Sequence, residues 1–398
     1  MIDFDEKKTK KITNCIITDN CSNFRSIMKL PNLPLTEAFG NFDPSFQGID
    51  QELLISMDSG HVQLKYQVDP EILYDVNNYA FRSESSLKSD RELRVLLKFL
   101  EDTLDYPDIR NILEIGANDL KLSKLLKKRT NSVSAVDPLL INDHGKVIDG
   151  IQVFGLPIEK VVKETKFIKP DLVIARHTLE HISNPKNMIE SLLELVSKDC
   201  IFVFEVPSLM HIVESLRFDA IFHQHYNYFD LDSVKKLIAE IGGELINFTY
   251  NNQGSNGGSL IFAFRKSKIK VDNETFDHEN KFNLLKARSA MYQEQMNLTM
   301  KILDELLPPV YGFGAGLMLA TLDYHLGGRL QNLECILDDD PKKDGIGYKN
   351  LNVLVKSTQR FIPPEQSSFV ITSLESIRPI YNRLIQFNPR RIIAPPVT

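Results

Sequence analysis

The feature that most constrains this chain is the segment 111–122, in which a short apolar run ends at a glycine and a helical pattern follows. Ile112, Leu113 and Ile115 form the run, and Gly116 ends it. A buried strand, a glycine turn and a helix are how an open α/β sheet presents a ligand site at its strand ends. Glycine lets a ligand approach the backbone closely, and the first turn of the helix offers free N–H donors. The dinucleotide-binding signature needs three glycines, whereas this turn has one.

Length and composition indicate a soluble protein of more than one domain. The 398 residues are too many for one typical core, so we expect two or three domains. The hydrophobic share of 42% and the charged share of 25% are ordinary for a globular protein. A formal net charge of −6 disfavours nucleic acid as a partner, because phosphate binding needs a concentrated basic surface.

The sequence also favours a cytoplasmic protein without a membrane partner. No apolar stretch approaches the length of a membrane span, and the charged N-terminus lacks a signal-peptide core. The cysteines are scattered and do not suggest a disulfide framework, so a reduced protein is expected, as a monomer or a homodimer. These cysteines are Cys15, Cys21, Cys200 and Cys335.

The pattern divides the chain into four segments. Residues 1–85 are expected to form a small, strand-poor N-terminal module that prolines punctuate, with an extended stretch at 30–35. Residues 86–270 are expected to form the main α/β domain, and 271–308 a polar helical connector. Residues 309–398 are expected to form a second, C-terminal α/β domain.

The main domain shows strands that alternate with helices. Apolar residues at helical spacing predict a helix over 87–104, and short apolar runs predict strands at 133–136, 171–175 and 201–206. This alternation predicts a parallel, doubly wound sheet of the Rossmann-like kind. The segment 243–265 predicts an antiparallel pair that closes the sheet edge.

The C-terminal segment begins with a second strand–glycine–helix unit. Gly312-Phe-Gly-Ala-Gly precedes a helical pattern, and Asp338 follows about one βαβ unit later. The final glycine of the dinucleotide signature is missing, so an NAD-linked oxidoreductase is disfavoured and a structural or substrate-covering role is expected. Further strands are predicted at 333–337, 368–372 and 391–394.

Asp137 lies about twenty residues beyond the first glycine turn, at the end of the second predicted strand. A carboxylate at this place can hold a ribose diol. The alternative is an acidic residue that only caps the strand end. The combination with Glu114 and Gly116 at this spacing favours the ribose role.

The richest polar cluster is Ala175-Arg-His-Thr-Leu-Glu-His-Ile, at the end of another predicted strand. His177 and His181 are four residues apart and would share one face of a helix. A metal pair with Glu180 is conceivable, but the zinc-protease spacing is absent. Histidines that merely cap the segment or lie on the surface are the competing interpretation.

A second cluster, 218–229, surrounds three polar side chains with aromatic residues. His223, His225 and Tyr226 could exchange protons or form strong hydrogen bonds, because histidine titrates near pH 6.5. Aromatic neighbours would exclude water and strengthen each polar contact. A functional site is favoured here over a buried aromatic hairpin with satisfied histidines.

Taken together and in this order, the motifs of the chain resemble the sugar C-methyltransferase family, and the match covers nearly the whole sequence. These enzymes use S-adenosylmethionine (SAM) to methylate nucleotide-linked keto-deoxysugars, and the resemblance implies a class I methyltransferase domain. The matching motifs are Pro34-Leu, Gly60-His-Val-Gln-Leu, Asp69-Pro-Glu-Ile-Leu-Tyr, Glu114-Ile-Gly-Ala-Asn-Asp, Ala175-Arg-His-Thr-Leu-Glu-His-Ile, Glu205-Val-Pro, His223-Gln-His, Asn256-Gly-Gly-Ser, Gly312-Phe-Gly-Ala and Asp339-Asp-Pro-Lys-Lys-Asp-Gly.

The resemblance implies roles for individual residues. His225 would take a proton from the carbon beside the ketone, His181 would hold or polarise the sugar, and His223 and Gln224 would complete the catalytic stretch. The implied cofactor-binding residues are Glu114, Gly116, Asn118, Asp119, Asp137, Pro138, Arg176 and His177. The implied substrate-binding residues are Tyr79, Phe222, Asn256 and Ser259, although Asn256-Gly-Gly-Ser alone favours a tight turn.

One departure from the family concerns a metal. The family's N-terminal module carries two Cys-x-x-Cys pairs for a structural zinc. Here Cys15 keeps one position, Thr18 occupies the next, and Ser56 and Ser59 replace the second pair. Serine is a poor zinc ligand beside thiolate, so we expect no zinc and no other metal.

The other departures lie around the proposed base. The family's Tyr-His-Glu-His is here Phe222-His-Gln-His, its tyrosine pair is reduced to Tyr79-Ala-Phe, and Leu120 replaces its glycine after Asn-Asp. Methylation at carbon remains the leading expectation. O- or N-methylation of a sugar, or binding of a nucleotide sugar without catalysis, stays open.

Overall fold

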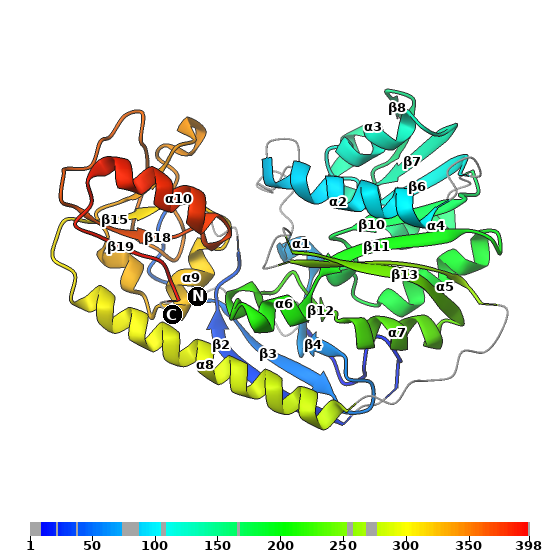
Figure 1. Cartoon of the computed structure of the whole chain (residues 1–398), viewed down its shortest axis with the longest axis horizontal. Coiled ribbons are helices and arrows are strands. Elements are labelled where there is room, and N and C mark those ends of the chain that lie inside the picture. The colour runs from blue at the N-terminus through cyan, green and yellow to red at the C-terminus, as the bar shows by residue number, and fades with distance from the viewer. Residues whose placement is uncertain are drawn as a thin grey trace.

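The computed structural model describes residues 9–20, 23–36, 39–73, 87–104, 109–164, 168–252, 258–267 and 277–396. A central α/β domain, an N-terminal sheet and a C-terminal α/β domain are joined by one long helix (Figure 1). Within these described ranges, none of the helices has the length and apolar character needed to cross a membrane.

The central domain contains an eight-stranded sheet in the order β13-β14-β11-β10-β6-β7-β9-β8. The five inner strands β11, β10, β6, β7 and β9 run parallel, and β14, β13 and β8 are antiparallel to their neighbours. The predicted doubly wound α/β fold and the predicted antiparallel edge pair are confirmed. The strands are β6 (Asn111–Ile115), β7 (Ser132–Val136), β8 (Val147–Ile148), β9 (Ile151–Phe154), β10 (Leu172–Arg176), β11 (Ile201–Pro207), β13 (Gly243–Asn251) and β14 (Ser259–Lys266).

Helices cover both faces of this sheet, and each face has its own apolar core. The helices α2 (Leu87–Thr103) and α3 (Lys121–Lys127) pack on one face, where Leu96, Leu100 and Leu126 are buried. The helices α4 (Ile158–Glu164), α5 (Pro185–Leu195) and α7 (Leu231–Glu240) pack on the other. The apolar residues whose spacing predicted the helix at 87–104 therefore face the sheet.

Local capping fixes where two of these helices begin. The Asn184 side chain accepts a hydrogen bond from the backbone N–H of Asn187, and Pro185 occupies the first turn of α5. Asp230 and Ser233 form a reciprocal capping box at the start of α7. Such caps satisfy N–H groups that the helix itself leaves without partners.

The N-terminal module contains more strand than expected. A four-stranded sheet has the order β12-β4-β3-β2, and β1 pairs with β5 in a two-stranded sheet. The expectation of a strand-poor module is wrong because Pro31 lies in an edge strand, where its missing N–H costs no inner ladder bond. The strands are β1 (Thr9–Lys11), β2 (Phe24–Leu33), β3 (Ile49–Ser56), β4 (Val62–Leu64), β5 (Tyr66–Val68) and β12 (Asn227–Tyr228), and α1 is Pro70–Leu73.

The predicted connector is α8 (His278–Asp304), a helix of 27 residues. It runs along β2 toward the C-terminal domain (Figure 1), and the Lys286 ammonium and Ser289 hydroxyl both donate to the Ile27 carbonyl. At its first turn, the Lys281 ammonium lies 2.5 Å from the Asp230 carboxylate.

The C-terminal domain is a five-stranded parallel sheet in the order β17-β16-β15-β18-β19. The predicted strands are present, and the strand β17 was not expected because it contains one apolar residue, Val355, and so no apolar run. The elements of this domain are β15 (Val310–Phe313), α9 (Leu319–His325), β16 (Ile336–Asp338), β17 (Val355–Ser357), β18 (Ser368–Ile371), α10 (Ile377–Leu384) and β19 (Arg391–Ile393). The remaining helix, α6 (Leu209–Glu214), lies in the central domain.

The Lys281–Asp230 pair should be a strong tie between the connector and the central domain. Burial raises the pKa of the Asp230 carboxyl, but Lys281 and the bonds from Ser233 outweigh it and hold that pKa below its usual range. We expect Lys281→Met to lower the free energy of unfolding by about 3–5 kcal/mol in urea titrations, because it leaves a buried carboxylate unpaired. The control, Lys98→Met, removes the exposed pair with Asp102 and should cost less than about 1 kcal/mol. Equal costs would contradict this interpretation.

Candidate active site

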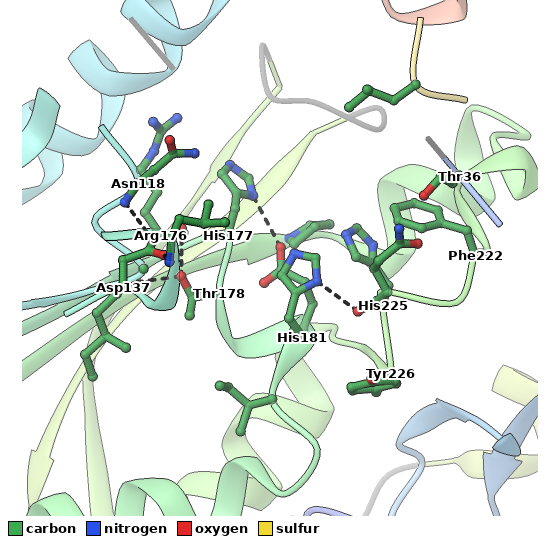
Figure 2. A pocket seen from close by; sticks show the side chains of 18 of the residues that line it. Thr36, Asn118, Asp137, Arg176, His177, Thr178, His181, Phe222, His225 and Tyr226 are labelled. Atoms are coloured by element: carbon green, nitrogen blue, oxygen red, sulfur yellow. Dashed lines mark hydrogen bonds and ion pairs between the residues drawn. The ribbon is translucent and has the colours of Figure 1, made fainter. Parts of the chain in front are cut away.

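A cavity of about 760 Å³ opens at the carboxyl ends of the parallel strands β6, β7 and β10 (Figure 2). Walls from the central domain and from the C-terminal domain enclose it. The residues proposed from the sequence that line it are Glu114, Gly116, Asn118, Asp137, Pro138, Arg176, His177, His181, Phe222, Gln224 and His225.

The glycine turn leaves no space for a side chain. Gly116 has φ +75°, a conformation that disfavours residues with a Cβ, and a Cβ there would lie 1.9 Å from Thr178 Oγ1. The Thr178 hydroxyl lies 3.2 Å from the Ile115 carbonyl, which places the loop after β10 against the turn after β6. This close approach defines the floor of the cavity.

Asp137 joins the second strand end to the glycine turn. Its carboxylate accepts hydrogen bonds from the backbone N–H of Asn118 at 2.7 Å and of Leu139 at 2.8 Å (Figure 2). A carboxylate has lone pairs for further donors, so these bonds leave acceptor capacity. Asp137 therefore lies where the sequence placed it, at a strand end that faces the cavity.

Glu114 is buried beneath the turn and accepts a short hydrogen bond from the Ser123 hydroxyl. Burial, with a smaller contribution from Asp137, raises the pKa of Glu114 to about 8 although the Ser123 bond opposes it. The carboxyl is therefore largely protonated at neutral pH. Asp119, another proposed cofactor residue, is not among the residues that line the cavity, and it accepts from the Lys121 N–H at 3.3 Å.

Arg176 lies between two carboxylates, Glu205 at 2.6 Å and Glu92 at 2.8 Å. Burial alone would lower the pKa of Arg176, but the two acids outweigh it and raise that pKa. Ser259, proposed to bind substrate, instead donates to Glu205 Oε1 at 2.6 Å and so supports this ion pair. Sequence reasoning missed Glu92. The pattern that could have indicated it is an acidic residue on the buried face of α2.

His177 is held between two acids in a backbone conformation unusual for histidine, with φ +48°. Its Nδ1 lies 3.7 Å from Glu180 Oε1, and its Nε2 lies 3.9 Å from Glu205 Oε1. Burial lowers the pKa of His177, but Glu180 and Glu205 outweigh this and raise the pKa above its usual value.

His181 and His225 form the opposite end of the cavity. Their ring centroids are 4.8 Å apart, and the Phe222 ring lies 4.1 Å from the His225 ring (Figure 2). The His181 Nδ1–H donates to the Gln224 carbonyl at 2.8 Å. Burial, followed by the nearby His181 and His177, lowers the pKa of His225 well below its usual value, so this ring is neutral at neutral pH. Its Nδ1 has no hydrogen-bond partner among the residues that the structure describes.

His223 lies elsewhere, in contact with the N-terminal module. Its Nε2–H donates to the Leu33 carbonyl at 3.1 Å, and its Nδ1 accepts from the Gln51 amide at 3.3 Å. Both ring nitrogens are thus used in packing, and His223 is not among the residues that line the cavity. His223 therefore packs against the N-terminal module, whereas the sequence had proposed a catalytic role for it. Two further proposed substrate residues, Tyr79 and Asn256, lie outside the described residues.

The C-terminal domain supplies a wall whose residues the sequence did not identify. An Arg217–Glu375 ion pair of 2.9 Å crosses between the central and C-terminal domains beside the cavity, and Asp219 chelates the same guanidinium at 2.8 Å. The structural or substrate-covering role expected of this domain stays a prediction, and its residues line the cavity. The C-terminal lining residues include Gly316, Leu317, Met318, Leu322, Thr372, Ser373 and Glu375.

One group of side chains in the described part of the chain could hold a metal ion. Glu180, His181 and His225 each offer one ligand atom, and these atoms lie within 4.8 Å of one another. Ligand atoms around a tetrahedral zinc ion with bonds of about 2.1 Å lie roughly 3.4 Å apart. The absence of a metal stays a prediction.

Comparisons with known proteins agree with this geometry. Residues 86–247 match the family described as Methyltransferase domain. The C-methyltransferase NovU of Streptomyces niveus is 25% identical over 202 residues, which are 50% of this chain and 47% of NovU, so the chain spans about half the length of this curated relative.

Solved structures of methyltransferases give weaker overall similarity. The N-methyltransferase NodS from Bradyrhizobium japonicum WM9, in complex with S-adenosyl-L-homocysteine, is 14% identical with a TM-score of 0.36, over 50% of this chain and 96% of that one. Magnesium protoporphyrin IX methyltransferase from Synechocystis PCC 6803, with the same compound bound, is 13% identical with a TM-score of 0.34, over 45% and 83%.

The chain therefore contains a methyltransferase domain of the SAM-dependent class, on the doubly wound fold that the sequence predicted. SAM is the cofactor of this class, and Glu114, Gly116, Asn118 and Asp137 line the cavity at the strand ends. The activity of the whole protein and its substrate are proposals.

We expect Gly116→Ala to weaken SAM binding by at least about tenfold in calorimetric titrations, because the new methyl collides with Thr178 and displaces the turn. The matched control is Gly145→Ala, at φ +79° with nothing within 4 Å of the added Cβ. It carries the same left-handed strain of about 1–2 kcal/mol without the collision. Equal SAM affinity in the two variants would show that the close contact with Thr178 is irrelevant to the cofactor.

Proposed function

We propose that this protein is a SAM-dependent C-methyltransferase that acts beside the keto group of a nucleotide-linked deoxysugar. The observation that carries the proposal is that one continuous cavity joins the glycine turn at Gly116 to the His181–His225 end. A cofactor bound at the turn and a sugar bound at the histidines would share this space. The similarity to the C-methyltransferase NovU over half of the chain supports the same reaction class.

The reaction needs a base that is neutral before turnover, and His225 meets this requirement. Its lowered pKa keeps a lone pair available, and Nδ1 lacks a partner among the described residues. The base takes the proton from the carbon beside the ketone, and the electron pair of that C–H bond forms an enolate. SAM held at the glycine turn would supply the methyl group to the enolate carbon, with its C–S bond breaking and S-adenosylhomocysteine as the leaving thioether.

His181 is the second polar group at the sugar end of the cavity. The Gln224 carbonyl accepts its Nδ1–H and so fixes the orientation of the ring. The ring lines the cavity beside His225, where it can contact the sugar near the keto oxygen on which charge develops. His181 is thus assigned to positioning and polarising the substrate, and His225 to proton removal.

The same geometry suits an O- or N-methyl acceptor, which needs a base but no enolate. Phe222 and Gln224 support this alternative. Where the resembled family has tyrosine and glutamate, the phenyl ring lacks a hydroxyl donor and the amide lacks a charge. A nucleotide-sugar binding protein without catalysis is the third candidate. The NAD-linked alternative is weaker, because the glycine signature at Gly312 is incomplete.

We expect His225→Asn to lower the rate of methyl transfer by about 10²–10⁴-fold, the usual contribution of a general base, while the SAM dissociation constant changes by no more than a few-fold. The assay would screen nucleotide-linked keto sugars for methyl transfer and for uptake of solvent deuterium beside the carbonyl. His144→Asn, at an exposed position, is the control. A fully active His225→Asn enzyme would remove His225 from the mechanism. Methyl transfer without deuterium uptake on any keto sugar would favour the O- or N-methyl acceptor.

Asp137→Ala should weaken SAM binding about 10- to 100-fold, because a hydrogen bond to a charged acceptor contributes about 1.5–3 kcal/mol. Calorimetric titrations with SAM and, separately, with NAD measure this and test the cofactor class. Unchanged SAM affinity in the variant would refute the ribose role of Asp137. Tight binding of NAD in place of SAM by the wild-type protein would refute the proposed function.

A further inference from the structure

Two tight turns of the N-terminal module face each other although they are far apart in the sequence. The first contains Cys15 and Thr18, and the Asp19 N–H donates to the Cys15 carbonyl at 2.8 Å. The second contains Ser56 and Ser59 and closes through a 2.8 Å bond from the Gly60 N–H to the Ser56 carbonyl. Cys15 Sγ and Ser59 Oγ, 44 residues apart in the chain, approach to 3.1 Å. The positions where the resembled family carries zinc cysteines are therefore brought together here.

A chain of hydrogen bonds fills the space between the turns. The Ser59 hydroxyl donates to Ser56 Oγ at 2.9 Å and accepts from the His61 N–H at 3.2 Å. Because a hydroxyl has a single hydrogen, the remaining contact of Ser59 Oγ must be a donation from the Cys15 thiol. Cys15, Ser56 and Ser59 are all at most 1% exposed. Water cannot reach their polar atoms, so the bonds within the cluster satisfy them.

This cluster does not fit a zinc ion. Zinc binds the thiolate, whereas Cys15 is used as a thiol donor. Ligand atoms around a tetrahedral zinc with bonds of about 2.3 Å lie roughly 3.8 Å apart. The separations of 3.1 Å for Cys15–Ser59 and 2.9 Å for Ser59–Ser56 are direct contacts that leave no room for an ion between them.

The cluster holds a turn that packs on the central domain. Cys15 and Ile17 belong to the apolar core beneath α5 and α7. Asp19, at the end of the same turn, contacts the Lys186 ammonium at 3.1 Å and the Asn184 amide at 3.2 Å, both at the start of α5. Fixing this turn therefore fixes how the N-terminal module meets the central domain.

We propose that the Cys15–Ser59–Ser56 hydrogen-bonded cluster closes the N-terminal module in place of a metal. The module is then independent of metal, and its two turns retain the placement of a four-cysteine site. Restoring cysteine at 18, 56 and 59 would create a zinc site that the natural sequence lacks. The proposal is independent of the reaction assigned to the cavity.

A pair of substitutions at Cys15 separates the hydrogen-bonded cluster from a zinc ligand. Cys15→Ser keeps the donor, so we expect the melting temperature to stay within about 0.5 °C of the wild-type value. Cys15→Ala removes the donor, and we expect it to lower the melting temperature by about 1–3 °C, a small shift because the entropy of unfolding grows with chain length. Ser197→Ala, at an exposed position, is the control and should have no effect. Equal losses in the two Cys15 variants would overturn the proposal.

Metal content gives a second, independent test. We expect the wild-type protein, purified without chelators, to carry less than about 0.1 zinc per chain and to keep its melting temperature in EDTA. The Thr18→Cys/Ser56→Cys/Ser59→Cys variant should bind one Co²⁺ with the visible spectrum of tetrahedral thiolate ligation, and Zn²⁺ should displace it and raise the melting temperature. One zinc per wild-type chain, or a folded triple variant without Co²⁺ binding, would overturn the proposal. If the triple variant does not fold, the Cys15 pair and the wild-type zinc content decide it.

Discussion

One buried amide, that of Asn227, connects the parts of the molecule that form the His181–His225 end of the cavity. Its backbone pairs with Gln63 in β4, which makes β12 the fourth strand of the N-terminal sheet. Its side chain donates to the Ile182 carbonyl at 2.8 Å and accepts from His61 Nε2 at 3.2 Å. Burial lowers the pKa of His61 to about 3 although the Asn227 bond opposes this, so His61 stays a neutral donor. A buried polar group without its partners would be costly, so this network specifies one arrangement of the loops.

The two histidine loops meet as a consequence of that arrangement. The Tyr226 N–H donates to the Glu180 carbonyl at 2.8 Å, and His181 donates to the Gln224 carbonyl, so each loop satisfies backbone groups of the other. The placement of His225 beside His181 thus depends on the N-terminal sheet, whose strands β2, β3 and β4 lie outside the matched residues 86–247. This dependence gives a physical reason for the extra module: it positions the loop that carries the proposed base.

Sequence patterns predicted the features that local periodicity determines. The strand–glycine–helix unit, the helix before it and the antiparallel edge pair follow from apolar spacing within about twenty residues. The strands of the N-terminal module escaped prediction because Pro31 obscured an edge strand. His223 and His225 could not be distinguished, since they lie two residues apart in one irregular loop and their surroundings come from Leu33, Gln51 and the His181 loop. Tertiary contacts, which no local pattern encodes, separate a packing histidine from one that faces the cavity.

The charges around the cavity bear on the proposed reaction. Arg176 is neutralised by Glu92 and Glu205, and Arg217 by Asp219 and Glu375, so neither guanidinium faces the sugar end as an unbalanced cation. In the proposed reaction, the sulfonium of bound SAM would be a positive partner of the enolate. Opposite charges attract more strongly in a dry cavity than in water, and methyl transfer neutralises both at once. Phe222, where the resembled family has a tyrosine, lacks a hydrogen-bond donor, and its ring lies 4.1 Å from the His225 ring. A site with fewer donors around the base can remain suited to a reaction whose main electrostatic partner is the cofactor.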